Sequence, residues 1–171
     1  TDIVFQQLEF SRNNTSIKTG ELPVIFTPRG IASALVQPLM AGLNGKLVLE
    51  GSSPLVNKLG EKSFDKSLSV FDDPTIDFQP GSRPCDDEGI ASQRTPLIEH
   101  GVVSNFLYDL QTAALAGKKS TGNGERHGSL PSPSVSTFIV SAGETIFSDM
   151  VADIKEGLVV EYLMGAGPGN T

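Results

Sequence analysis

Residues 95–117 read TPLIEHGVVSNFLYDLQTAALAG. Residues 95–108 place two apolar runs around a turn that contains Gly101, and this pattern predicts a β-hairpin. Asp109 can then cap a helix, and Gly117 can end that helix because glycine readily adopts left-handed backbone angles. The stretch therefore predicts an antiparallel strand pair with a helix directly after it.

The same kind of pattern continues on both sides of this stretch. A β-branched and aromatic run bounded by prolines predicts a buried strand over 23–28, and apolar residues at helical spacing predict a helix over 29–43, which Pro38 should kink or shorten. Further elements are expected as a short helix over 54–59, a strand over 68–71, a loop over 79–89, a long polar loop over 118–133, a strand over 137–140, a helix over 147–154 and a strand over 158–163. Hairpin strands with helices inserted between them predict an α+β fold, in which a largely antiparallel sheet carries a few packed helices.

Composition limits the classes of partner. The 171 residues carry 13 Lys and Arg against 20 Asp and Glu, a net charge of −7 that opposes contact with nucleic-acid phosphates. A single cysteine cannot form an intrachain disulfide, and no apolar stretch approaches the roughly 18 residues of a membrane span. We therefore expect a cytoplasmic protein with no direct nucleic-acid or membrane contact.

The ends of the chain suggest a part of a longer protein. Residues 1–20 combine a small apolar cluster with a polar run and are expected to be an N-terminal segment and linker. Residues 21–171 are expected to form one domain. The chain starts without Met and ends in the glycine-rich run 165–171, which we expect to be a terminal loop after the last strand.

Few residues indicate chemistry by themselves. His100 and His127 lie in an expected turn and a polar loop, without a second ligand at the spacing that a zinc helix needs. Cys85 and His127 could act as nucleophile and base, although nothing in the sequence places them together. The run 86–89, DDEG, offers three carboxylates that could hold Ca²⁺ or Mg²⁺, or could instead form a turn in which the side chains accept backbone N–H groups.

A set of short motifs carries more information together than any one of them does alone. In chain order they are DDP at 72–74, GSRP at 81–84, DDEG at 86–89, PLIE at 96–99, STGN at 120–123 and PSPS at 131–134. This ordered series resembles the TldD/PmbA family, whose members are named modulators of DNA gyrase and are regarded as metalloproteases. GELPVIF at 20–26 and LGEK at 59–62 are more similar to the PmbA (TldE) type of subunit than to the TldD type.

The resemblance has a direct implication for the metal. The TldD type carries a His-Glu-x-x-x-His motif on the helix after the first strand, and the corresponding positions here are Val36, Gln37 and Ala41. These side chains offer neither metal ligands nor a base. The resemblance thus implies no catalytic residue and no cofactor in this chain, with zinc in a metal-bearing partner. The family's third ligand, a cysteine, lies beyond the end of this chain, so Cys85 is not its counterpart.

The resemblance also implies a C-terminal-type domain over 21–171, incomplete at its C-terminal end, and an assembly of two subunits. We expect a TldD-type paralogue or a second copy as partner, and a peptide or unfolded protein as substrate. The predicted sheet edge and the loop from Lys118 to Pro133 are the expected contact regions. The expected substrate or partner contacts are Asp86, Asp87, Glu88, Ser120, Thr121, Asn123 and Arg126.

Two other functions stay open from the sequence. The first is an independent hydrolase that uses Cys85 or a cation bound at residues 86–88. The second is a protein-binding modulator of DNA gyrase that performs no chemistry.

Overall fold

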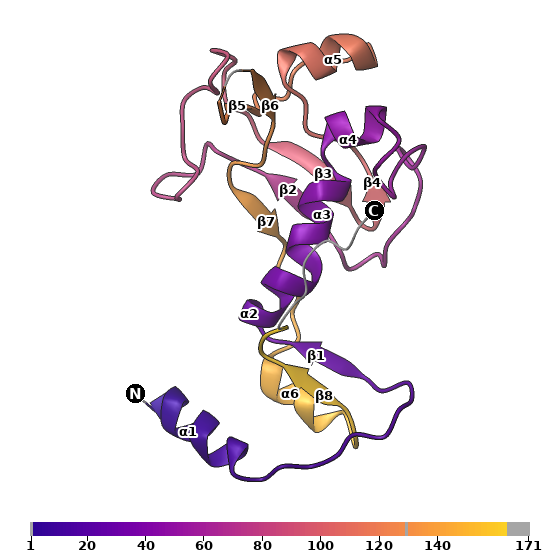
Figure 1. Cartoon of the computed structure of the whole chain (residues 1–171), viewed down its shortest axis with the longest axis vertical. Coiled ribbons are helices and arrows are strands. Elements are labelled where there is room, and N and C mark those ends of the chain that lie inside the picture. The colour runs from indigo at the N-terminus through magenta and orange to yellow at the C-terminus, as the bar shows by residue number, and fades with distance from the viewer. Residues whose placement is uncertain (1, 129, 164–171) are drawn as a thin grey trace.

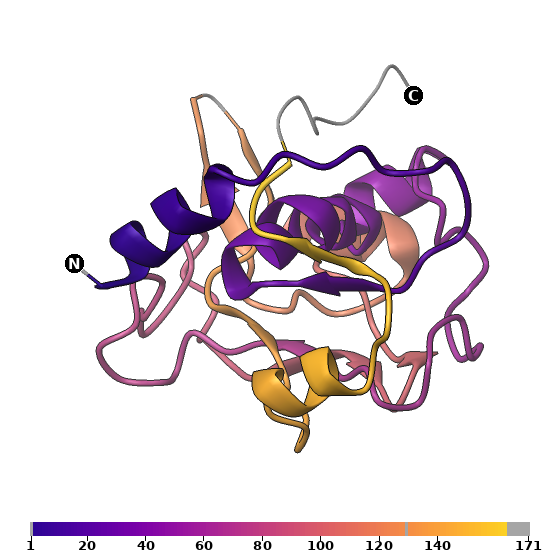
Figure 2. The ribbon, with the colours of Figure 1, turned by 90° about the horizontal axis from the view of Figure 1, so that it is seen from below.

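The structure is a computed structural model that describes residues 2–128 and 130–163. Its centre is an antiparallel sheet with a layer of helices on one side (Figures 1 and 2). The sheet contains, in spatial order, β4 (Val102–Val103), β3 (Thr95–Glu99), β2 (Val70–Asp72) and β7 (Phe138–Val140). The predicted α+β class with largely antiparallel pairing is therefore confirmed, and the hairpin predicted over 95–108 is β3 and β4.

The helical layer begins directly after the first strand. It consists of α2 (Pro28–Ile31), the π-helical turn η1 (Ala32–Val36), α3 (Gln37–Gly42) and α4 (Gly45–Leu49). At the end of η1 the Gln37 N–H donates to the Ala32 carbonyl five residues earlier. Pro38 has no N–H to continue the regular pattern, so the wider turn just before it accommodates the proline. The predicted helix over 29–43 is thus present, with its irregularity next to Pro38.

The core lies between the helices and the sheet. Leu39 and Leu43 of the helical layer pack with Leu97 and Ile98 of β3 and with Val103 of β4, and all five side chains are buried. The pairing of β2 with β3 is irregular at one point, because the register shifts between Val70 and Phe71. Burial of these side chains is the main force that holds the two layers together.

Helix α5 (Leu110–Ala116) follows the hairpin as the sequence predicts. The Asp109 Oδ1 accepts a hydrogen bond from the Thr112 N–H at 2.5 Å, and Gly117 has a φ of 64°. A side-chain cap at the start and a left-handed glycine at the end are the expected boundary signals of a helix.

The short helix predicted over 54–59 is wrong. Ser53 does cap the segment, since its Oγ accepts from the Leu55 N–H at 3.0 Å, but the chain makes only a turn. Asn57 has a φ of 62°, and a residue in the left-handed region ends a right-handed helix after one turn. Helix α4, which the sequence analysis did not predict, forms instead where Asn44 caps the Lys46 and Leu47 N–H groups.

The long loop predicted over 118–133 is wrong in part. It contains a second antiparallel pair, β5 (Gly124–Arg126) and β6 (Pro131–Pro133). Prolines argue against a strand because they lack a donor, but two short edge strands tolerate them. We refer to residues 124–133 as the β5–β6 hairpin.

A separate two-stranded ribbon lies away from this core (Figure 1). It pairs β1 (Val24–Phe26) with β8 (Leu158–Val160) in parallel, and α6 (Phe147–Ala152) lies beside it. Both strands and the helix are shorter than predicted. At the N-terminus α1 (Asp2–Ser11) adds a helix whose Val4, Phe5, Leu8 and Phe10 side chains are exposed.

Within the part of the chain that the structure describes, no helix is both long enough and apolar enough to cross a membrane. The glycine-rich loop expected over 165–171 lies outside the described residues.

Gly30 of α2 packs closely against the backbone of β8, and this contact between the helical layer and the ribbon allows a stability test. A Cβ atom at position 30 would overlap the Val160 carbonyl oxygen, which also accepts the Thr27 N–H at 3.0 Å. We expect Gly30→Ala to lower the free energy of unfolding by about 1–3 kcal/mol, because overpacking against backbone cannot relax cheaply. Gly20→Ala is the matched control, since nothing lies within 4 Å of the added atom. Equal denaturation midpoints for the two variants would show that the ribbon does not pack closely against α2.

Candidate functional site

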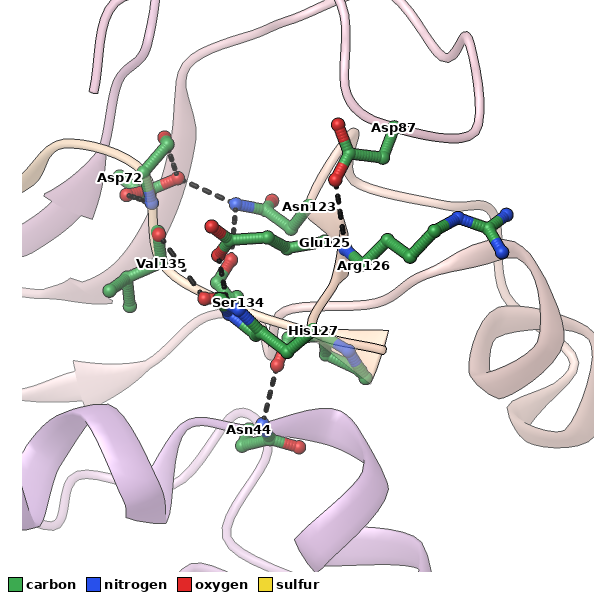
Figure 3. Close-up of polar contacts among 11 residues, drawn as sticks. Asn44, Asp72, Asp87, Asn123, Glu125, Arg126, His127, Ser134 and Val135 are labelled. Atoms are coloured by element: carbon green, nitrogen blue, oxygen red, sulfur yellow. Dashed lines mark hydrogen bonds and ion pairs between the residues drawn. The ribbon is translucent and has the colours of Figure 1, made fainter. Parts of the chain in front are cut away.

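The seven residues expected as contacts all lie around the β5–β6 hairpin. The acidic loop that contains Asp86, Asp87 and Glu88 runs beside β5, and the segment 120–123 leads into the same strand (Figure 3). Residues more than thirty positions apart are therefore brought together by backbone hydrogen bonds, such as that from the Asp87 N–H to the Gly124 carbonyl at 3.0 Å.

The three carboxylates of the acidic loop bind backbone donors. Asp86 is buried and accepts from the N–H groups of Glu88 at 3.0 Å, Ile90 at 2.9 Å and Gly124 at 2.9 Å. Asp87 accepts from the Arg126 N–H at 2.8 Å. These contacts fix the loop against β5, as expected for a turn built on local side-chain acceptors.

Glu88 connects the loop to the helix after the hairpin. Its Oε2 accepts from the Leu110 N–H at 2.7 Å, at the first turn of α5, where a negative side chain is favourable. Among residues 2–128 and 130–163, no group of three or more His, Cys, Asp or Glu side chains is arranged to hold a metal ion.

A buried polar cluster fixes the base of the hairpin. The Asn123 amide donates to Asp72 Oδ2 at 2.6 Å and to the Ser134 carbonyl at 3.0 Å. Asp72 also accepts from the Ser136 N–H at 2.9 Å and the Ser136 hydroxyl at 2.6 Å. Figure 3 shows Asp72 and Asn123 facing each other across this cluster. Both residues are almost fully buried, so Asn123 holds the hairpin on the sheet and presents no side chain to a partner.

Ser120 and Thr121 hold the segment between β4 and α5 in place through hydrogen bonds to the backbone of Tyr108. The Thr121 Oγ1 accepts from the Tyr108 N–H at 2.8 Å, and the hydroxyls of both residues donate to the Tyr108 carbonyl at 3.1 Å. Burial raises the pKa of the Tyr108 phenol, because it disfavours the charged form of that side chain.

The outward part of this region is the end of the hairpin together with Asp87 of the neighbouring acidic loop. Asp87, Arg126 and His127 are exposed and Glu125 is half-buried, with the Glu125 Oε2 3.3 Å from the His127 Nε2. In Figure 3 the Arg126 side chain extends away from the buried cluster. We call these four residues the hairpin tip. The expected contacts include neither Glu125 nor His127; Glu125 lies in β5, and His127 directly follows that strand.

The hairpin is tied to the helical layer through Asn44. The Asn44 amide donates to the Pro133 carbonyl at 2.8 Å while its Oδ1 caps α4 (Figure 3). Asn44 lies between the end of α3 at Gly42 and the start of α4, so one side chain connects the hairpin to the junction of these two helices.

The positions that the resemblance aligns with the metal motif lie in the consecutive segments η1 and α3, and none of them is a histidine, a cysteine or a carboxylate. Val36 ends η1 and is half-buried, while Gln37 and Ala41 are exposed and lie four residues apart in α3, on the same side of the helix. Valine and alanine have no lone pair for a metal, and a glutamine amide is not a base.

Cys85 and His100, the other two reactive residues, take part in turns. Cys85 is exposed and pairs with Ala91 in an isolated β-bridge at the start of the acidic loop. His100 occupies the left-handed region with a φ of 48° at the start of the β3–β4 turn, and its N–H donates to the Ser69 Oγ at 3.1 Å. His127 pairs with Glu125 and no described contact joins it to Cys85.

Comparison with known proteins gives evidence on the family of this chain that is separate from the geometry of the site. Residues 19–171 match the model of the PmbA/TldA metallopeptidase C-terminal domain. A metalloprotease TldD homologue of Haemophilus influenzae is 32% identical over 148 residues, which are 85% of this chain and 31% of that protein.

Two solved structures share the fold. TldE from Thermococcus kodakarensis superposes with a TM-score of 0.88 and 28% identity, over 96% of this chain and 38% of that one. A candidate modulator of a DNA gyrase from Thermotoga maritima gives a TM-score of 0.81 and 27% identity, over 91% and 35% of the two chains. The chain thus spans about a third of the length of the relatives that it matches. From the domain match and these likenesses we conclude that the chain belongs to the PmbA/TldD metallopeptidase family.

Proposed function

We propose that this chain is the metal-free subunit of a TldD/PmbA-type metalloprotease complex that acts on peptides or unfolded proteins. The observation that carries the proposal is the set Val36, Gln37 and Ala41, which occupies the place of the family's His-Glu-x-x-x-His motif and offers no ligand or base. Water activation then depends on zinc in a TldD-type paralogue; a homodimer of this chain, the other assembly that the resemblance implies, would have no such zinc.

In this proposal the chain contributes surfaces that position the substrate. The hairpin tip is one such surface, because its charged side chains face outward from a base that buried hydrogen bonds hold rigid. Strand β7 is a second, since it is an edge of the four-stranded sheet and an extended peptide can add to a free edge. Positioning alone can contribute much of a rate enhancement without any reacting group.

The lone cysteine and the net charge of −7 are compatible with the cytoplasmic setting that we propose for this complex, without direct contact to nucleic acid. A protein-binding role on DNA gyrase is the second candidate. The observation in its favour is the likeness to the Thermotoga maritima protein described as a candidate gyrase modulator. Such a role would act through protein contacts and would not need a metal-bearing partner.

Metal content tests the first proposal. After incubation with zinc and exhaustive dialysis, we expect elemental analysis to find far less than one zinc per chain, because positions 36, 37 and 41 hold no ligand. A variant with His100→Ala and His127→Ala is the control, and its residual zinc should equal that of the unmodified chain. One tightly held zinc per chain, lost in that variant, would contradict the proposal.

A further inference from the structure

A cleft of about 430 Å³ lies outside the hairpin region. It is formed by the loop after β2, and Arg83, Ser92 and Asp77 line it. This volume is within the range of pockets that hold small ligands or single side chains of a larger one. Neither the hairpin tip nor the helix with Gln37 and Ala41 contributes to it.

Two residues that line the cleft, Arg83 and Ser92, have buried polar atoms that form no hydrogen bond. The Nε and Nη2 atoms of Arg83 and the Oγ atom of Ser92 are buried, and none of the three has a hydrogen-bond partner among the described residues. Within residues 2–128 and 130–163, no carboxylate forms an ion pair with Arg83. A guanidinium is always charged, and a shielded charge without a partner is unfavourable, so this arrangement requires an explanation.

The backbone around these atoms is well held. The Arg83 N–H donates to the Pro74 carbonyl at 3.1 Å, and the Ser92 N–H donates to the Pro84 carbonyl at 3.0 Å. A Cβ at Gly81 would overlap the Ser136 carbonyl, so the loop also packs closely against the segment before β7. The chain thus fixes the position of Arg83 and supplies its guanidinium with no acceptor.

We propose that Arg83 anchors a carboxylate of a bound peptide in this cleft. The N–H groups of Nε and Nη2 point in the same direction and form the fork that pairs with both oxygens of a carboxylate. Because the two nitrogens hold no hydrogen bond, a small turn of the guanidinium toward the cleft breaks none. The Ser92 hydroxyl supplies a further donor at the same wall.

Asp77 favours a carboxylate over a phosphate group. It lines the same cleft and adds a negative charge, which opposes a doubly charged phosphate more strongly than a singly charged carboxylate. That the carboxylate belongs to a peptide rests on the proposed function, whereas the binding of an anionic group by Arg83 does not.

Fluorescence polarisation with labelled, unstructured Gly-Ser peptides tests the proposal. One peptide ends in a free carboxylate, a second ends in an amide, and a third ends in an amide but contains one Glu. We expect the chain to bind the first or the third peptide at least tenfold more tightly than the second, and the stronger of the two identifies the source of the carboxylate. Arg83→Gln should remove this preference. Arg12→Gln is the matched control, since it removes the same charge from an exposed residue just after α1, far along the sequence from Arg83.

A second measurement separates ligand binding from a structural role. Thermal denaturation of Arg83→Gln should show a midpoint equal to or above that of the unmodified chain, because no internal partner is lost. A lowered midpoint would overturn the proposal, and so would equal binding of all three peptides or a preference that persists in Arg83→Gln. These results do not depend on peptide cleavage, so failure of the proposed function would be recognised separately, by zinc content and activity.

Discussion

Replacement of Asp72 with alanine is expected to lower the free energy of unfolding by about 3–5 kcal/mol. The Asp72 side chain is fully buried and accepts three hydrogen bonds, from the Asn123 amide and from the N–H and hydroxyl of Ser136. Alanine would leave these donors buried without an acceptor and would open a cavity at the junction of β2, β7 and the β5–β6 hairpin. Chemical denaturation monitored by circular dichroism measures the change.

Two variants serve as controls for this prediction. Asp77→Ala removes an exposed carboxylate from a nearby loop and should change the free energy of unfolding by less than about 0.5 kcal/mol. Asp72→Asn keeps the size of the side chain and one acceptor, so its loss should fall between those of the two alanine variants. Equal stability of Asp72→Ala and Asp77→Ala would show that the buried cluster does not hold the hairpin.

The elements that the sequence predicts well are those with local signals. The boundaries of α5 follow from Asp109 and Gly117, which act on backbone groups within the same turn. The β3–β4 hairpin follows from two apolar runs around Gly101. In each case the residues that decide the structure are close in sequence, so a pattern contains the information.

The β5–β6 hairpin and the roles of its residues depend on distant contacts. Pro131 and Pro133 argue against a strand locally, and the pairing is supported by Asn44, which lies 89 positions from Pro133. Asn123 looks like a polar contact residue in the sequence, but a carboxylate 51 positions away at Asp72 makes it part of the interior. Which polar side chains face outward could therefore be decided only after folding.

The same limit applies to Arg83. An arginine in a loop that is rich in acidic residues is expected to find a carboxylate partner, and in the sequence it does not differ from Arg94. The structure pairs Arg94 with Asp73 at 3.9 Å and stacks it on Phe71, whereas Arg83 has no comparable contact in the described residues. The absence of a partner is a property of three-dimensional packing.

Peptide cleavage by a reconstituted pair tests the central claim most directly. The full-length chain, a TldD-type paralogue and their mixture are each incubated with an unstructured fluorogenic peptide. We expect no cleavage by the chain alone and the fastest cleavage by the mixture, because zinc in the partner activates water while this chain positions the substrate. Replacement of the Glu in the partner's His-Glu-x-x-x-His motif should abolish the activity of the mixture.

Variants of this chain make the measurement specific. Cys85 and His100 lie outside the hairpin tip, and Cys85→Ala or His100→Ala leaves the partner's metal site intact, so activity of the mixture should persist in both variants. Arg126→Glu at the hairpin tip should lower turnover or assembly several-fold, since it reverses a charge on the proposed contact surface while its backbone N–H can still bind Asp87. The account predicts cleavage only when the metal-bearing partner is present; cleavage by this chain alone, abolished by Cys85→Ala, would contradict it.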